Sequence, residues 1–340
     1  MTVRKNRIRL VGALLALVLS LSLVGCAVRE GSADDGRLRV VTTLFPYYDF
    51  ARAVAGDRAD VTLLLAPGRE AHSFEPTPLD AVTISRADVF IYNGGEGEVW
   101  ADDMLDAVGE DIGTVLRMMD FVDAREEEFS EGMQGADSHD HAHDHDHDHE
   151  LHDHAEHDHD DSDEVEYDEH IWTSPVNAMA LCRAICDTLC EADPDNADGY
   201  RARLEGYLDE LQALDDTFRD IVDGAARRLV VFGDRFPLLY FCREYDLDYR
   251  AAFHGCAGDT EPSLATLKYL IDLVDAEDIP VVYTIELSSQ KVANAIAETT
   301  GAQVRTFHSC QTVSRAEFDG GATYISLMTA NAAVLKEGLS

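Results

Sequence analysis

Apolar residues along this chain form short runs typical of buried strands, and most of these runs alternate with segments of helical spacing. The strand-like runs cover residues 38–43, 61–66, 89–93, 229–233, 249–253, 281–286 and 304–307. Strands that alternate with helices favour parallel sheets, because a crossover helix returns the chain to the same end of the sheet. The pattern therefore predicts an α/β fold with two lobes of parallel sheet flanked by helices, residues 38–192 and residues 226–340.

Between the two lobes, the spacing of apolar residues predicts one long helix over residues 193–225. Asp193 and Pro194 suit the start of a helix, and Gly224 suits its end. The apolar residues at helical spacing are Leu204, Tyr207, Leu208, Leu211, Leu214, Phe218, Ile221 and Val222. About 28 residues at ~1.5 Å each would make a rod of roughly 40 Å, long enough to run along both lobes.

The start of the chain has the pattern of an export signal rather than of a folded element. Four basic residues precede an apolar run, residues 10–23, that is too short to span a membrane comfortably. The run ends in Leu-Val-Gly-Cys, which resembles a bacterial lipoprotein box in which Cys26 is acylated. We expect a signal peptide over 1–25 and a lipidated tether over 26–37. The protein would then be anchored outside the cytoplasmic membrane, on the periplasmic side if an outer membrane exists.

The chain is strongly acidic, with 66 acidic and 27 basic side chains and a formal net charge of −39. This charge makes nucleic acid and anionic membrane surfaces poor partners, and it favours cations. Apolar residues make up 46% of the chain, which is enough for packed cores. We therefore expect a folded monomer whose ligands are cations.

Ten of the fourteen histidines gather in one tract inside the first lobe, interleaved with acidic residues. They are His139, His141, His143, His145, His147, His149, His152, His154, His157 and His159. Such a composition predicts a loop over residues 137–166 that is disordered when empty. It is either a solvated acidic loop or a metal-binding one. Imidazole beside carboxylate suits zinc, nickel or copper, which favours metal binding with many interchangeable geometries.

The cysteines fall into two groups. Cys182, Cys186 and Cys190 recur every four residues, as one stripe of a helix, where free cysteine acts as a small apolar residue. Cys256 and Cys310 each follow a strand-like run, and an exported protein permits disulfides. A disulfide between these two is one possibility, although sequence alone leaves the connectivity open.

The remaining four histidines, His72, His170, His254 and His308, lie apart from the tract. His254 and His308 follow the strand-like runs directly, and His72 lies just beyond another. Ligands of open α/β sheets bind outside the carboxyl ends of the strands. Any one of these histidines could be a structural residue, but together they favour one buried zinc site.

Several motifs resemble a known family in order and spacing. "LLAPGREAHSFEPTPLD" is followed by "ADVFIYNGGEGEVW", the histidine-rich tract, "DEHIWTSPVNA" and a closing "YISLMTANAAVLKEGL". These motifs resemble the substrate-binding lipoprotein of bacterial zinc and manganese ABC importers, from about residue 38 to the end. The resemblance implies two α/β lobes, a rigid long helix that joins them, and a metal site in the cleft between the lobes.

The resemblance also implies a set of metal ligands. Carried onto this chain, the set is His72, His170, His308 and Asp234, with water as the alternative to Asp234. Glu169 replaces the proline of the family's second motif. Gly233 occupies the family's third ligand position and has no side chain to bind with. His308 stands at the fourth position, where manganese members carry a carboxylate, and would replace the missing third ligand from the other side of the cleft. His254 has no ligand role in the family, and we expect it in the cleft wall, with Glu286 orienting other groups.

Three imidazoles, with or without one carboxylate, match tetrahedral zinc better than manganese, which prefers more oxygen. We therefore expect the extracytoplasmic, high-affinity zinc-binding component of an ABC importer, with a permease and an ATPase as partners. The tract would be an accessory metal collector, with sensing or storage as alternatives. Other interpretations are a manganese-binding protein of the same importer class and a surface metal-storage or adhesion protein. A metallohydrolase could use Asp234 or Glu286 as base, but no HExxH signature is present, so we expect no enzyme.

Overall fold

The computed structural model describes residues 36–71, 73–108, 112–133, 166–255 and 262–340. The chain divides into two units, Met1–Arg37 and Leu38–Ser340, and every element below belongs to the second. Cys26, His72, the ten histidines of the tract and Cys256 lie outside the described residues. Within the described ranges, no helix combines the length and the apolar character needed to cross a membrane.

The first lobe contains a parallel sheet of strand order β2-β1-β3-β4. Its strands are β1 (Leu38–Thr42), β2 (Ala59–Leu63), β3 (Val89–Tyr92) and β4 (Thr114–Arg117). Its helices are α2 (Phe45–Ala55), α3 (Pro78–Ile84) and α4 (Val99–Val108), with short 3₁₀ turns η1 (Gly56–Arg58), η2 (Glu96–Glu98) and η4 (Met118–Phe121). The order of successive strands reverses between β1 and β3, both of which are parallel to their neighbours, and such a point is where open α/β sheets commonly bind ligands.

The second lobe repeats this arrangement with the order β6-β5-β7-β8, again all parallel. Its strands are β5 (Leu229–Phe236), β6 (Asp248–His254), β7 (Val281–Thr284) and β8 (Gln303–Thr306). Its helices are α7 (Leu239–Glu244), α8 (Leu264–Ala276), α9 (Lys291–Thr300) and α10 (Arg315–Asp319). The prediction of two parallel α/β lobes is confirmed.

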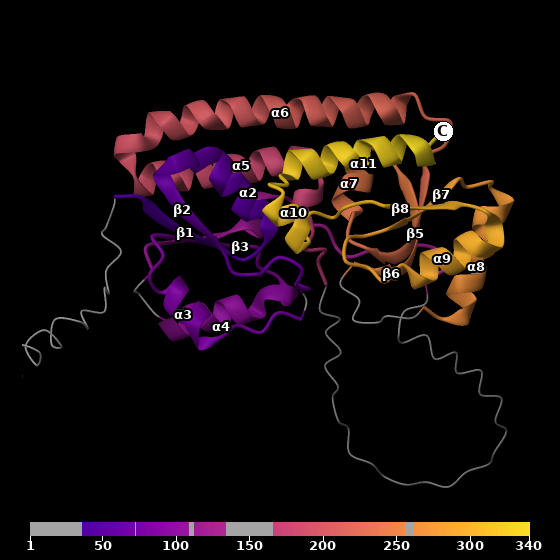
Figure 1. The fold of residues 1–340 in the computed structure, drawn as a ribbon, viewed down its shortest axis with the longest axis horizontal. Coiled ribbons are helices and arrows are strands. Elements are labelled where there is room, and N and C mark those ends of the chain that lie inside the picture. The colour runs from indigo at the N-terminus through magenta and orange to yellow at the C-terminus, as the bar shows by residue number, and fades with distance from the viewer. Residues whose placement is uncertain (1–35, 72, 109–111, 134–165, 256–261) are drawn as a thin grey trace, which may run out of the picture. The chain divides into compact units, whose positions relative to one another are not determined.

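The long helix α6 (Ala197–Asp223) runs along both lobes, beside α5 (Pro175–Ala192) and α11 (Tyr324–Gly338) (Figure 1). The chain turns from α5 into α6 through η6 (Pro194–Asn196), where the Asp193 carboxylate accepts hydrogen bonds from Asn196 and Tyr200. The 27 residues of α6 span about 40 Å, as expected.

One hydrophobic core runs continuously from the first lobe through α5, α6 and α11 into the second. The outer faces of the two sheets have smaller cores of their own, under α3 and α4 in one lobe and under α8 and α9 in the other. The three cysteines of α5, Cys182, Cys186 and Cys190, are buried in the shared core, as their spacing predicts. Because the lobes share this core, the structure holds them as one packed body.

The strand β4 is missing from the sequence prediction. Three of its four residues are exposed and only Leu116 is buried, so this edge strand carries too few apolar positions to be recognised by pattern. The other strands lie within a few residues of their predicted positions.

Asp49 of α2 joins three helices of the shared core. Its buried carboxylate accepts hydrogen bonds from the Tyr324 backbone N–H of α11 (2.8 Å) and from the Tyr207 hydroxyl of α6 (3.3 Å). Burial raises the pKa of Asp49 from 3.8 to about 6, although these hydrogen bonds and Arg52 act in the opposite direction. This carboxyl therefore keeps its proton in the folded protein at a pH where the unfolded chain has lost it.

We predict that Asp49→Asn flattens the dependence of stability on pH. In the wild type, the folded state holds the Asp49 proton more tightly than the unfolded chain does. The free energy of unfolding is therefore highest below about pH 4 and falls as the pH rises through about 6. The difference between the two pKa values corresponds to a loss of roughly 3 kcal/mol in the free energy of unfolding across this pH range. Urea unfolding at several pH values between 4 and 7.5 should show a smaller decline for the variant, and parallel curves for the two proteins would contradict the assignment.

Candidate metal centre

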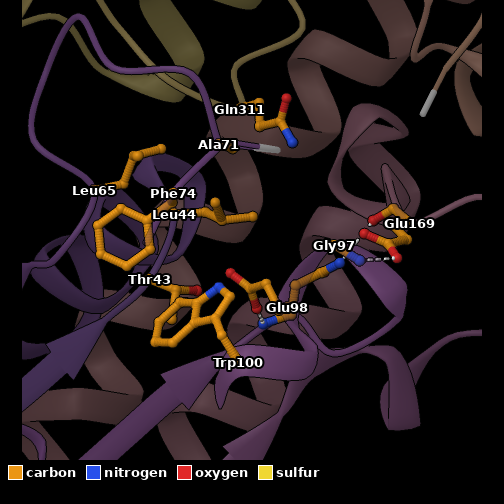
Figure 2. A pocket seen from close by; sticks show the side chains of 11 residues that line it. Thr43, Leu44, Leu65, Ala71, Phe74, Gly97, Glu98, Trp100, Glu169 and Gln311 are labelled. Atoms are coloured by element: carbon orange, nitrogen blue, oxygen red, sulfur yellow. Dashed lines mark hydrogen bonds between the residues drawn. The ribbon is translucent and has the colours of Figure 1, made fainter. Parts of the chain in front are cut away.

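A small cavity lies where the segments that carry the predicted ligand histidines meet (Figure 2). It holds about 20 Å³, room for one water-sized group. Ala71 and Phe74, which flank position 72, line it together with Glu169, next to His170, and Gln311, which lies three residues beyond His308. The remaining lining residues are Thr43, Leu44, Leu65, Asn93, Gly97, Glu98 and Trp100. Sequence neighbours of the three predicted histidine ligands thus line one cavity, although His170 and His308 themselves are not among its lining residues.

His170, buried at the start of η5 (Ile171–Thr173), is oriented by Asp168. The Oδ1 atom of Asp168 accepts the His170 backbone N–H at 2.8 Å and lies 3.2 Å from the ring Nδ1. An ionised carboxylate can only accept, so in the neutral ring Nδ1 carries the proton and Nε2 keeps the lone pair that a metal needs. Burial lowers the pKa of His170, but the charge and the hydrogen bond of Asp168 raise it. Together with the neighbouring acidic residues these outweigh the burial, so the pKa of His170 lies above its ordinary value.

The backbone around Asp168 is attached to the second lobe. The Tyr240 hydroxyl of α7 donates to the Asp168 carbonyl (2.8 Å) and accepts from the Arg125 N–H (3.0 Å), while Asp168 donates its own N–H to the Arg125 carbonyl. Trp172 Nε1 donates to the Ser309 carbonyl (2.8 Å), beside His308. His170 therefore has a fixed position relative to both lobes.

His308 has a fixed backbone, but its ring is in a different state. Asn331 pairs with the His308 N–H and carbonyl, both at 2.7 Å. The ring Nδ1 accepts the Cys310 N–H at 2.9 Å, so in the neutral ring the proton lies on Nε2, 3.8 Å from the Glu317 carboxylate. His308 can bind a metal only after its Nδ1 gives up the Cys310 N–H, because Nδ1 must then either bind the metal itself or carry the proton that leaves Nε2.

Glu286 holds the turn that carries His308, as expected of an orienting residue. Its carboxylate accepts both the N–H and the hydroxyl of Ser309, at 2.8 and 2.5 Å, and lies 3.7 Å from the His308 Nδ1. Cys310 is a buried free thiol in the structure, while Cys256 is outside the described residues, so their pairing stays a prediction.

The Asp234 carboxylate accepts hydrogen bonds from two backbone N–H groups. One oxygen accepts the Arg235 N–H at 2.9 Å and the other accepts the Ile285 N–H at 3.4 Å. Burial raises the pKa of Asp234, although these hydrogen bonds lower it. Asp234 is absent from the lining of the cavity, and its role as a ligand stays a prediction.

Gly233 is a glycine because it packs against α9. A Cβ atom at this position would lie 2.5 Å from the Ala293 Cα, so a side chain here would point at α9. The register of β5 shifts between Phe232 and Arg235, and Arg235 forms an ion pair with Glu70 (2.9 Å), two residues before position 72. At the position where the resemblance implies the family's third ligand, a side chain would therefore collide with α9.

His254 does not line the cavity. Its Nδ1 lies 3.1 Å from the Glu127 carboxylate, and its ring packs beside Phe129. Glu127 also donates its N–H to the Glu166 carbonyl, so this contact attaches the base of the histidine-rich tract to β6. His254 thus anchors a segment of the first lobe on the second.

Two acidic residues of the cavity, Glu98 and Glu169, are missing from the predicted site. Glu98 accepts the N–H groups of Asn93 (2.6 Å) and Gly94 (3.2 Å), and Glu169 accepts the Gly97 N–H (2.7 Å). Burial raises the pKa of Glu98 to about 7, the charge of Glu169 adds to this increase, and the hydrogen bonds of Glu98 oppose it. The only sequence signal for them is the glycine-rich stretch "NGGEGE", whose backbone they bind.

Within the described ranges, no group of three or more histidine, cysteine or acidic side chains is arranged to hold a metal ion. One predicted ligand, His72, lies outside those ranges. Among the described residues, the Nε2 atom of His170 is an imidazole nitrogen that the hydrogen bonds leave able to bind a metal, while the carboxylates of Glu98 and of its sequence neighbour Glu169 line the cavity.

Comparisons with known proteins relate the chain to one family. A family model described as zinc-uptake complex component A, periplasmic, matches residues 40–338. The chain is 31% identical over 326 residues to the high-affinity zinc uptake system protein ZnuA of Bacillus subtilis, with 95% of each chain covered. It is 30% identical over 330 residues to the zinc-binding lipoprotein AdcA of Streptococcus pneumoniae. This match covers 96% of this chain but only 60% of the relative.

Solved structures have the same fold. The metal-dependent lipoprotein YcdH from Bacillus subtilis matches with a TM-score of 0.71 and 28% identity, over 89% of this chain and 100% of that one. The Zn(II)-bound ZnuA-like domain of Streptococcus pneumoniae AdcA matches with a TM-score of 0.69 and 26% identity, over 89% and 99%.

We predict that Asp168→Asn weakens zinc binding by about 10- to 100-fold, because the amide no longer selects the Nδ1–H form of His170. The backbone contacts of residue 168 with Tyr240 and Arg125 do not involve the carboxylate and should survive. Competition against a chelator of known affinity measures the effect. An unchanged affinity in a fully folded variant would show that Asp168 does not orient the ligand.

Gly233→His should not restore a third ligand. The new side chain would meet Ala293, and overpacking of this kind destabilises by about 1–3 kcal/mol. Thermal unfolding and zinc competition should show a lower Tm with no gain in affinity. A variant of normal Tm that binds zinc more tightly would overturn the steric explanation.

Proposed function

Because the chain belongs to the family of periplasmic zinc-uptake complex component A proteins, we propose that it is the high-affinity zinc-binding component of an ABC-type importer. This proposal rests above all on the convergence of the segments around residue 72, His170 and His308 on one cavity. The zinc-bound state of the AdcA domain, which shares the fold, supports it. The protein would capture Zn²⁺ and pass it to a membrane permease that an ATPase drives, without catalysing a reaction.

The proposed ligands are His72, His170 and His308, with Asp234 or water in the fourth position. His170 provides a neutral imidazole nitrogen in a fixed direction, which suits tetrahedral zinc. Metal binding to His308 requires its ring to leave the Cys310 amide, so occupancy of the site would be coupled to the turn that Glu286 and Asn331 hold.

The rest of the chain has supporting roles in this proposal. Cys26 would carry the acyl chains that keep the protein, a monomer, at the outer side of the cytoplasmic membrane. The ten histidines of the tract would collect metal at low selectivity and raise its concentration near the cleft. Glu166, the first described residue after the tract in sequence, is linked to β6 through Glu127 and His254.

Zinc competition on three proteins tests the proposal: the wild type, a Ser138–Glu164 deletion and His72→Ala. We expect the deletion to keep one tight site that His72→Ala destroys, and manganese to bind more weakly than zinc. Tight binding that disappears with the tract and survives His72→Ala would instead indicate a metal-storage protein. Tighter binding of manganese than of zinc would indicate that manganese is the transported ion.

A further inference from the structure

The cavity combines histidine neighbourhoods with two buried carboxyl groups. Glu98 and Glu169 are both about 6% exposed and come from distant segments, η2 and the turn before η5. Figure 2 shows their side chains beside the same space, with Glu169 hydrogen-bonded to the Gly97 N–H. Like charges buried close together destabilise a protein unless a cation accompanies them.

The backbone around Glu169 directs its side chain inward. A Cβ atom on Gly95 would lie 2.5 Å from the Glu169 Oε1, so only glycine leaves room for the carboxylate here. Asn93 donates its side-chain N–H to the Glu169 carbonyl at 2.9 Å and holds the turn from the other side. The Glu169 carboxylate therefore has a defined place at the cavity, and Glu169 directly precedes His170 in the sequence.

A site of neutral imidazoles leaves the double positive charge of zinc uncompensated. Burying such a charge without an opposite charge nearby is strongly unfavourable. The carboxylate of Asp234 is occupied by two backbone amides, that of Asp168 by His170, and that of Glu286 by Ser309. Of these acidic residues and the two of the cavity, only Glu98 and Glu169 line the space itself.

We propose that Glu169, together with Glu98, compensates the charge of the bound metal and so determines how tightly the histidine site holds a divalent cation. The inference deepens the proposed function and rests on it. Glu169 acts here as a positioning charge and need not be a ligand, since its Oε1 remains on the Gly97 amide. In the metal-free protein the same charge faces Glu98, so Glu169 lowers stability there and raises it only when metal is bound.

The test compares Glu169→Gln with the wild type in the full chain. Glutamine keeps an acceptor for the Gly97 N–H and removes only the charge. The matched control is Glu166→Gln, which removes one charge from the same stretch but does not line the cavity. Zinc affinity is measured by chelator competition, and Tm is measured for the metal-free and the zinc-loaded protein.

We expect Glu169→Gln to weaken zinc binding at least tenfold while the Tm of the metal-free protein stays equal or rises. Glu166→Gln should stay within about twofold of the wild type. A Tm that falls equally in both forms would assign Glu169 a structural role and overturn the inference, as would an affinity within twofold of the wild type. If the wild type itself fails to compete with the chelator, the proposed function fails and this inference fails with it.

Discussion

The hydrogen bond between Asp168 and the imidazole of His170 is the contact on which the proposed metal site depends. It sets which ring nitrogen can bind a metal, and the same carboxylate holds the His170 backbone N–H. The residue that makes this contact is itself held by Tyr240 of the second lobe. The direction of one lone pair is thus determined by elements of both lobes.

The packing of the lobes explains how this geometry is maintained. Trp172, two residues beyond His170, is fully buried, donates to the Ser309 carbonyl and accepts from the Tyr324 hydroxyl through its own carbonyl. Asp49 joins α2 to α6 and α11 in the same core. These buried hydrogen bonds lie within the hydrophobic core that both lobes share, so the segment that carries His170 is held on a packed base.

Much of the fold follows from periodicity, and much of the site does not. The two sheets, the long helix and the cysteine stripe of α5 could be predicted because each depends on the spacing of apolar residues along one segment. The role of Glu169 could not, since it depends on Gly95, Gly97 and Glu98, which lie more than 70 residues away in the sequence. Likewise, only the contact of Gly233 with Ala293 explains why no ligand occurs there, and only the Cys310 amide reveals the ring state of His308.

The most direct test of the account is the position of zinc in crystals grown with one equivalent of the metal, located by anomalous scattering at the zinc edge. The account predicts one strong peak about 2.0–2.1 Å from the Nε2 of His170. A zinc peak elsewhere, with His170 Nε2 in contact with protein atoms alone, would contradict it.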